Sequence, residues 1–492
     1  MSYQHQQSGG YRNHSALRRD VVSWSGIFRL DEKKFLKTSF LYGDLFYQTP
    51  GALTKAEFDL NPKASRPAGG GFPSAQNAKA SIRQRSFISG VSYTQNFTSH
   101  WQNKTVLYGM FTELINPAIR NYGKNSEPHV GGRTIFKYNR LIKKSILNFD
   151  VGAEWQQGFS TFSIHKNVGG NADSLRSLDE INNRQQFVFT QISMDVKSFT
   201  LIAGASWNLL KIKFERFTPA SLGKQQRKFD NQLSPRIALM KKFETSGANI
   251  NIYSSVSKGF SPPTAAELLP TGSAVNLLLN AEEGINYDLG FKASVNGKLY
   301  ADVNAFIFAL QNTIVQRRDA GGGDFYLNAG KTKQHGVETY ISYSLSQREL
   351  NKTLIWISHT WHNFHYKDFK QLTNDYSGKQ LPSVSPHTIS TGMDFQMKKG
   401  FFAALNYYYA GKIPLNDANT EYAKAYHLPG AKIGFQKLIK EKWNIKLNMG
   451  ADNLLNEKYS LGNDINAFGG RYYNAAAGRN YFVALMLQCF SN

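Results

Sequence analysis

Five residues of this 492-residue chain carry the chemistry that we consider first, because they stand in or beside polar segments that interrupt its apolar patterns. They are four arginines and a tyrosine: Arg120, Tyr122, Arg133, Arg184 and Arg317. A guanidinium group stays charged and forms paired hydrogen bonds with a carboxylate. These residues therefore suit the binding of an anion that carries carboxylates. Each could instead be solvated at the surface, so two interpretations stay open for each side chain.

The other reactive groups form no catalytic or metal-binding pattern. The sequence has no nucleophile motif and no glycine loop followed by Lys and Ser or Thr, so we predict neither an enzyme nor a bound cofactor. His359, His362 and His365 are close in sequence, but on a strand His362 faces away from the other two. The single cysteine, Cys489, can form neither an internal disulfide nor a cysteine metal cluster. We therefore predict no metal site.

The elements that must position the five residues are strands. Between Trp443 and Asp452 every second residue is apolar, and segments 148–156, 249–252 and 301–307 show the same alternation. Period two is typical of a strand with one apolar and one polar face. About nineteen such strands follow one another without helices between them. This pattern predicts an all-β fold built on one continuous antiparallel sheet.

The connections between the predicted strands alternate in length. Tight turns are expected at residues 31–34, 98–101, 245–247, 296–298 and 398–400. Long segments are expected at residues 48–80, 116–129, 158–183, 258–283, 366–383 and 455–476. Short turns at one end and long loops at the other are typical of a transmembrane β-barrel of the bacterial outer membrane. In this scheme Arg120 and Tyr122 lie in a loop, Arg133 and Arg184 border loops, and Arg317 begins a loop that contains glycines 321–323.

The composition agrees with a barrel in a membrane. Hydrophobic residues make up 41% of the chain and the mean hydropathy is −0.42. No apolar run approaches the roughly 18 residues of a membrane helix, and a barrel needs none because only alternate residues face lipid. The net charge of +23 does not predict a nucleic-acid partner, because lysine pairs such as 143–144 and 398–399 lie in predicted turns. We expect them to meet anionic lipid headgroups of the outer membrane, or water, whereas an arginine of an outer loop could meet a lipopolysaccharide phosphate.

The start of the chain does not match that of a complete barrel. The first twenty residues contain no apolar core of the length found in a secretion signal. The predicted strand 18–30 would run from the loop side to the turn side, and an odd strand count conflicts with the even number in single-chain bacterial barrels. We therefore expect the first strands of the barrel to lie outside this sequence.

Several segments, taken in order, resemble one protein family. They read YQTPGALT at 47–54, SSVSKGFSPPTAAE at 254–267, EEGINYDLG at 282–290, GKTKQHGVE at 330–338, LPSVSPH at 381–387 and DNLLNEKY at 452–459. The ordered set is similar to the TonB-dependent outer-membrane receptors of the ferric-citrate and siderophore type. Asp288 stands where that family usually has Glu. Ser491 and Asn492 follow the aromatic residue on which the family usually ends.

The resemblance implies a barrel of about 22 strands, of which about 19 lie in residues 1–492, without the N-terminal plug and the first strands. It implies a monomer in the outer membrane that takes up a ferric siderophore or a ferric-citrate-like chelate, driven by the TonB complex through the missing plug segment. Arg120, Arg133 and Arg184 stand roughly where ferric-citrate-type members have arginines. Two alternatives stay open: a passive pore without a plug, and a gene fragment without function.

Overall fold

The computed structural model describes residues 1–269, 276–318, 324–346, 351–371, 373–440 and 442–490. The strands of the main sheet are β1 (Ser2–Ser8), β2 (Leu17–Arg29), β3 (Lys34–Gln48), β4 (Ser81–Asn96), β5 (Trp101–Pro117), β6 (Asn121–Ile142), β7 (Ser145–Val168), β8 (Asn171–Val196), β9 (Phe199–Thr218), β10 (Leu222–Lys228), β11 (Gln232–Glu244), β12 (Ala248–Ser261), β13 (Glu282–Val295), β14 (Leu299–Arg318), β15 (Asp324–Ser346), β16 (Asn351–Asp368), β19 (His387–Met397), β20 (Phe401–Ala410), β23 (Tyr426–Ile439), β24 (Trp443–Asp452) and β27 (Asn480–Cys489).

Short elements lie in the connections between these strands. They are α1 (Lys55–Leu60), α2 (Ala265–Leu268), the 3-10 helix η1 (Phe468–Gly470), and the strands β17 (Lys370–Gln371), β18 (Asn374–Asp375), β21 (Ile413–Pro414), β22 (Tyr422–Ala423), β25 (Ser460–Asn463) and β26 (Tyr473–Ala475). Within the described part of the chain, no helix has the length and apolar character needed to cross a lipid bilayer.

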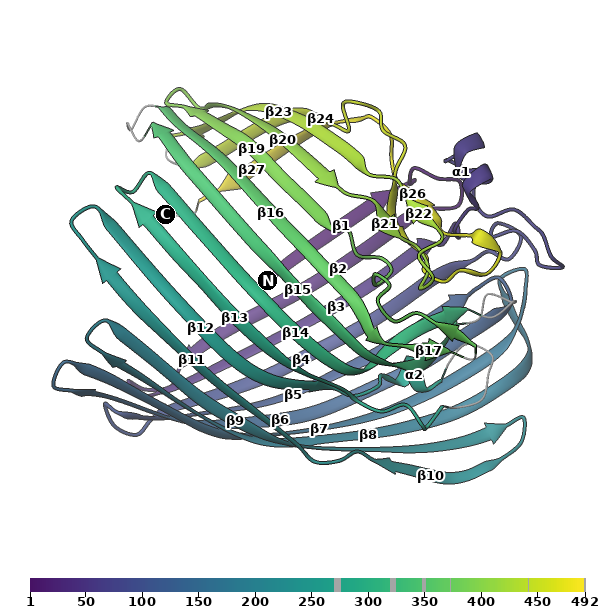
Figure 1. Ribbon diagram of the computed structural model, residues 1–492, viewed down its shortest axis with the longest axis horizontal. Helices are drawn as coiled ribbons and strands as arrows, with labels where there is room; N and C mark the ends of the chain where they lie inside the picture. The colour runs from purple at the N-terminus through teal and green to yellow at the C-terminus, as the bar shows by residue number, and fades with distance from the viewer. Residues whose placement is uncertain (270–275, 319–323, 347–350, 372, 441, 491–492) are drawn as a thin grey trace.

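The main sheet has 21 strands, and neighbours in the chain pair antiparallel from β1 to β27. β9 pairs with β11 along its first half and with β10 along its second half, so β10 and β11 lie one after the other beside it. Figure 1 shows that the sheet curls round, so that strands of its two halves cross in projection. β1 and β27 are its terminal strands, and the described residues form no ladder between them. The all-β antiparallel prediction is confirmed, although β1 and β10 were not predicted.

Strand register keeps the two predicted faces separate. Glu154 pairs with Arg133, and Arg133 pairs with Val106, so one row of side chains crosses β7, β6 and β5. Val151 and Trp155 of β7 occupy alternate positions and are 39% and 38% exposed. We call the face with Val151 and Trp155 the outer face, because the apolar side chains of a membrane barrel point to lipid. The face with Glu154 and Arg133 is the inner face.

Two of the predicted loops, 116–129 and 158–183, are wrong. β5 and β6 are joined by residues 118–120 alone, and β7 and β8 by Gly169 and Gly170, so both hairpins extend well beyond the apolar part of the sheet. Backbone pairing continues there without apolar alternation, because an antiparallel ladder can be exposed to water. The two glycines have φ values of 59° and 87°, which is the backbone conformation of a tight hairpin turn.

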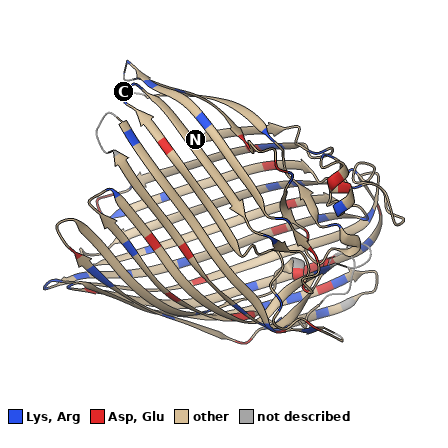
Figure 2. Cartoon of the chain, turned by 45° about the horizontal axis from the view of Figure 1, so that its top comes forward, with Lys and Arg blue, Asp and Glu red and all other residues tan. Residues whose placement is uncertain are grey.

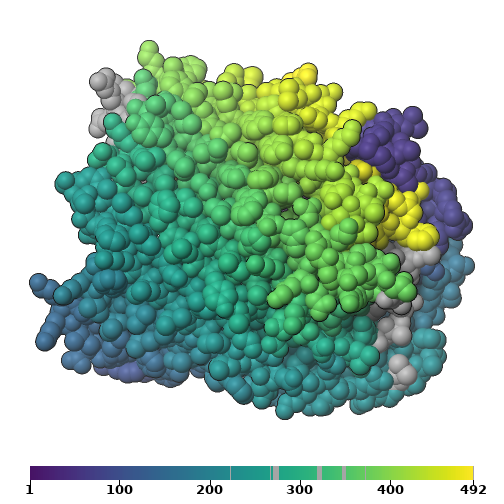
Figure 3. Space-filling model, in the orientation of Figure 1, coloured from purple at the N-terminus to yellow at the C-terminus, as the bar shows by residue number. Residues whose placement is uncertain are grey.

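The other long connections are confirmed as mostly irregular, and several of them pack together at the end opposite the tight turns. We call segments 49–80, 411–425 and 453–479 the loop cap, because they share an apolar cluster built from Leu53, Phe58, Leu415, Ala423 and Tyr473. Leu53 and Tyr473 exchange backbone hydrogen bonds of 2.9 and 3.0 Å. In Figure 3 the purple and yellow atoms meet at this end of the molecule. Residues some 400 positions apart in the sequence are therefore in contact within the loop cap.

Candidate functional site

Arg133 lies on the inner face, in the middle of β6, where it is held from two sides. Its guanidinium lies 3.5 Å from the Glu154 carboxylate and 4.8 Å from the centre of the Phe189 ring. Tyr108 donates a hydrogen bond of 2.6 Å to Glu154, whose side chain is 9% exposed. The Arg133 side chain is 42% exposed. The guanidinium is thus fixed in position and still presents donors to the interior of the barrel, which suits recognition of a carboxylate.

Arg120 and Tyr122 lie at the tip of the β5–β6 hairpin, not in a long loop. Arg120 is exposed in the connecting turn, and its guanidinium lies 5.2 Å from the centre of the Phe72 ring. Tyr122 is the second residue of β6, and its ring meets that of His165 edge to face at 6.5 Å. Tyr122 pairs with His165, so the strand register places it on the outer face, as it does Arg184. The structure therefore brings neither Arg120 nor Tyr122 against Arg133.

Arg184 lies on the outer face. It pairs with Gln157 on β7, and the same strand register places Val188 beside Ala153. Arg184 therefore shares its face with Val188, which is 54% exposed, and not with Arg133. A ligand inside the barrel cannot contact both arginines.

Arg317 is engaged in a buried ion pair. Its guanidinium lies 2.5 Å from the Asp417 carboxylate, and the two side chains are 11% and 1% exposed. Tyr366 donates a hydrogen bond of 2.7 Å to the same carboxylate, and Gln371 accepts one of 2.5 Å from Arg317. Burial and the charge of Asp417 raise the pKa of the Tyr366 hydroxyl, which therefore stays protonated as a donor. Arg317 holds the ends of β14 and β16 to the loop cap, and glycines 321–323 beyond it lie outside the described residues.

Sequence analysis did not single out Tyr366 or Asp417. They stand 49 and 100 positions after Arg317, in segments whose local pattern resembles any polar connection. The structure also brings His359 against His387 of the next strand, with 3.2 Å between Nε2 and Nδ1. Among the described residues, no group of three His, Cys, Asp or Glu side chains is arranged to hold a metal ion.

A second ion pair joins distant parts of the loop cap. Arg471 donates hydrogen bonds of 2.6 and 3.0 Å to the two carboxylate oxygens of Glu57. Glu57 also closes the capping box that begins α1 at Thr54. Burial acts to raise the pKa of the Glu57 carboxyl, but the hydrogen bonds from Arg471 and from the Thr54 backbone are stronger together and lower it. The charged form of Glu57 therefore stabilises the contact between segments 49–80 and 453–479.

This contact should weaken in acid. Because the folded-state pKa of Glu57 is lowered, its contribution is complete above the unfolded pKa of about 4.3 and is lost as the pH falls through the folded value. We expect hydrogen exchange of the α1 amides, corrected for intrinsic rates, to stay slow from neutral pH to about pH 5 and to accelerate below about pH 4. Glu57→Gln should exchange faster at neutral pH and lose this acid step. An unchanged acid step in Glu57→Gln would assign it to another group.

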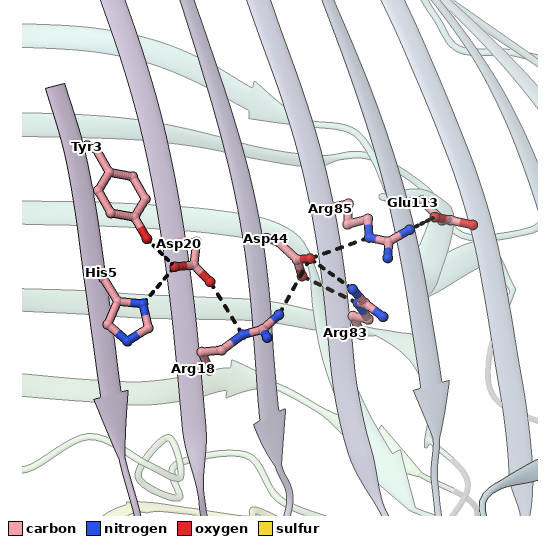
Figure 4. Close-up of polar contacts among 8 residues, drawn as sticks. All are labelled: Tyr3, His5, Arg18, Asp20, Asp44, Arg83, Arg85 and Glu113. Carbon is pink, nitrogen blue, oxygen red and sulfur yellow. Dashed lines mark hydrogen bonds and ion pairs between the residues drawn. The ribbon is translucent and has the colours of Figure 1, made fainter. Parts of the chain in front are cut away.

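Charged residues are spread over many strands and turns, as Figure 2 shows. Strand register places one group of them on the outer face of β1 to β5. Figure 4 shows its members: Tyr3, His5, Arg18, Asp20, Asp44, Arg83, Arg85 and Glu113. Asp44 lies 2.9 Å from Arg83, 3.5 Å from Arg85 and 3.7 Å from Arg18. Each arginine already faces a carboxylate, so the group joins neighbouring strands and has no excess charge to offer a ligand.

Comparison with known proteins agrees with this architecture. The family model described as TonB dependent receptor-like, beta-barrel matches residues 25–454. The unliganded ferric citrate transporter FecA has a similar structure, with a TM-score of 0.81 and 16% identity over 99% of this chain and 72% of FecA. The ferric-catecholate import receptor Fiu from K12 E. coli has a TM-score of 0.76 and 12% identity, over 99% of this chain and 77% of Fiu.

The ferric yersiniabactin uptake receptor FyuA from Yersinia pestis is a third similar structure, with a TM-score of 0.74 and 13% identity over 98% of this chain and 73% of FyuA. At such identities the structures show a shared fold. The family assignment rests on the match to residues 25–454, which cover most of the sheet. The family resides in the outer membrane, and its members are receptors and transporters, not enzymes. The chain belongs to the TonB-dependent receptors.

Proposed function

We propose that residues 1–492 form one receptor barrel for the TonB-dependent uptake of an anionic ferric chelate, of the siderophore or ferric-citrate-like class. The observation that supports this proposal most is Arg133, which is fixed by Glu154 and Phe189 and remains open to the barrel interior. A ferric chelate with free carboxylates offers the acceptors that such a guanidinium recognises. FecA, Fiu and FyuA are named for ferric citrate, ferric catecholate and ferric yersiniabactin, which supports a ferric chelate as the cargo class.

Uptake of radioactive iron tests the proposal. Residues 1–492 would be expressed together with the plug segment that the family resemblance implies, in a Gram-negative host that lacks its own ferric-chelate receptors, with and without a functional TonB. We expect accumulation of iron from ferric citrate or from a ferric siderophore only when TonB is present. Accumulation that persists without TonB would support the passive pore. A chain that is absent from the outer membrane and supports no uptake would support the gene fragment.

Arg133 and Arg184 form a matched pair for a binding test, because they lie on opposite faces of adjoining hairpins. Arg133→Ala should weaken ferric citrate binding by about ten- to a hundredfold, since a charge-assisted hydrogen bond contributes roughly 1.5–3 kcal/mol. Arg184→Ala removes the same charge from the outer face and should leave the affinity unchanged. The measurement is quenching of tryptophan fluorescence on the purified protein. Equal losses in both variants would show that overall charge matters more than a specific site.

A further inference from the structure

A hollow of about 530 Å³ lies on the inner face near the tight turns, and neither Arg133 nor any residue of the loop cap lines it. Its walls come from five neighbouring strands, β16, β19, β20, β23 and β24. The residues that matter to its chemistry are Lys352, Asp394, Gln396, Phe402, Lys432 and Lys446. Sequence analysis did not single out any of them.

Strand register explains why these residues converge. Lys352 pairs with Gln396, Gln396 with Phe402, and Phe402 with Gly434, so they form one row across the sheet. The floor is low because Gly434 has no side chain: a Cβ there would lie 2.3 Å from the tip of the Phe402 ring. The ring thus lies across Gly434. Lys432 lies two residues before Gly434 on β23, and Lys446 lies on β24. Both flank the Phe402 ring on the side opposite Lys352.

The hollow carries excess positive charge. Three ammonium groups face a single carboxylate, that of Asp394, which accepts a hydrogen bond of 3.0 Å from the Trp356 indole. Among the described residues, no carboxylate lies within 4.0 Å of Lys352, Lys432 or Lys446. Lys446 lies instead over the Phe402 ring, 4.9 Å from its centre. Like charges in one hollow repel one another, and a bound anion would relieve that repulsion.

We propose that this hollow is a second anion site, which takes a small molecule with two or three carboxylates. Its volume falls within the range of small-ligand pockets, and Gln396 and Gln436 add amide donors beside the lysines. The site rests on the proposed function and deepens it, because it lies on the same inner face as Arg133, nearer the tight turns. It would hold the anionic cargo after the cargo has left Arg133.

The use of lysine rather than arginine fits such a transient site. An ammonium group is a compact point charge on a flexible stem, whereas a guanidinium imposes a planar two-bond geometry. Lysines therefore accept carboxylates in several orientations, and the affinity depends strongly on salt because the site is open to water. A site with these properties holds an anion loosely and releases it readily.

Titration of the purified full chain with citrate alone, by calorimetry at low and at physiological salt, tests the inference. The double variant Lys432→Gln/Lys446→Gln should bind citrate at least tenfold more weakly, with a reduced salt dependence. Lys437→Gln is the matched control, because it removes one lysine charge from the exposed outer side of the same strand. The citrate affinity of Lys437→Gln should equal that of the unmodified chain. If the double variant does not fold, each single variant should show a loss of about threefold or more.

Unchanged citrate affinity in the lysine variants, or no citrate binding by the unmodified chain, would overturn the inference. An acidic decapeptide that binds more tightly than citrate and requires the same lysines would also overturn it, because the occupant would then be a peptide segment. Iron uptake separates this inference from the proposed function. If uptake of iron depends on TonB but citrate binding does not depend on the lysines, only the second site is contradicted. If citrate binding depends on the lysines but no ferric chelate is taken up, only the proposed cargo is contradicted.

Discussion

Asp417→Ala is expected to destabilise the loop cap by about 3–5 kcal/mol, because it leaves the Arg317 guanidinium buried without its carboxylate. Tyr366 loses its hydrogen-bond acceptor in the same variant. The change should appear as faster hydrogen exchange in segment 411–425 and as faster proteolysis there. The tight-turn end of the sheet, which this ion pair does not touch, should keep its protection.

An exposed ion pair nearby provides the control. Lys370 and Asp375 lie 3.9 Å apart, and their side chains are 72% and 54% exposed. Lys370→Ala should therefore change protection by less than about 1 kcal/mol, as is usual for solvated pairs. If Asp417→Ala left the loop cap as stable as before and only altered ferric citrate binding, Arg317 would be a ligand residue, as the sequence suggested, and not a residue that holds the cap.

Leu447→Lys is expected to destabilise the folded barrel in a bilayer by about 2–4 kcal/mol. Leu447 lies in the middle of β24 on the outer face, and it is 43% exposed. A lysine at the depth of the membrane centre loses its hydration, and the penalty falls to about 0–1 kcal/mol near the interfaces. The measurement is equilibrium unfolding by urea of protein inserted into lipid vesicles.

Asn448→Asp is the neighbouring control for this prediction, because it adds a charge whose sign is opposite to that of Lys446. Residue 448 points to the inner face, where Lys446 already lies and where water is accessible. This variant should lose less than about 0.5 kcal/mol, which is the usual effect of a surface substitution. If the variant at residue 448 lost more stability than Leu447→Lys, the inner and outer faces would be assigned the wrong way round. The assignments of Arg133 and Arg184 would then be reversed as well.

The comparison of sequence and structure is clearest for these two arginines. Arg184 is four residues from Val188 and eight from Ile192, so the alternation alone places it on the apolar face of its strand. The sequence predicts a loop up to residue 183 because the polar residues there show no apolar alternation, although β8 begins at Asn171. Hydropathy marks where a strand leaves the membrane. It does not mark where the strand ends, because backbone pairing continues in water.

Local sequence patterns were sufficient to predict the all-β class, the two faces of the strands, the tight turns and the family, since each depends on residues close together in the chain. Which inward lysines meet, and which arginine already has a carboxylate partner, depends on contacts between distant segments. Lys352, Lys432 and Lys446 converge through the register of five strands. Arg317 meets Asp417 because the apolar clusters of the loops bring together segments 100 residues apart. Side-chain alternation is a local property of one strand, whereas register and loop packing depend on pairing between distant segments.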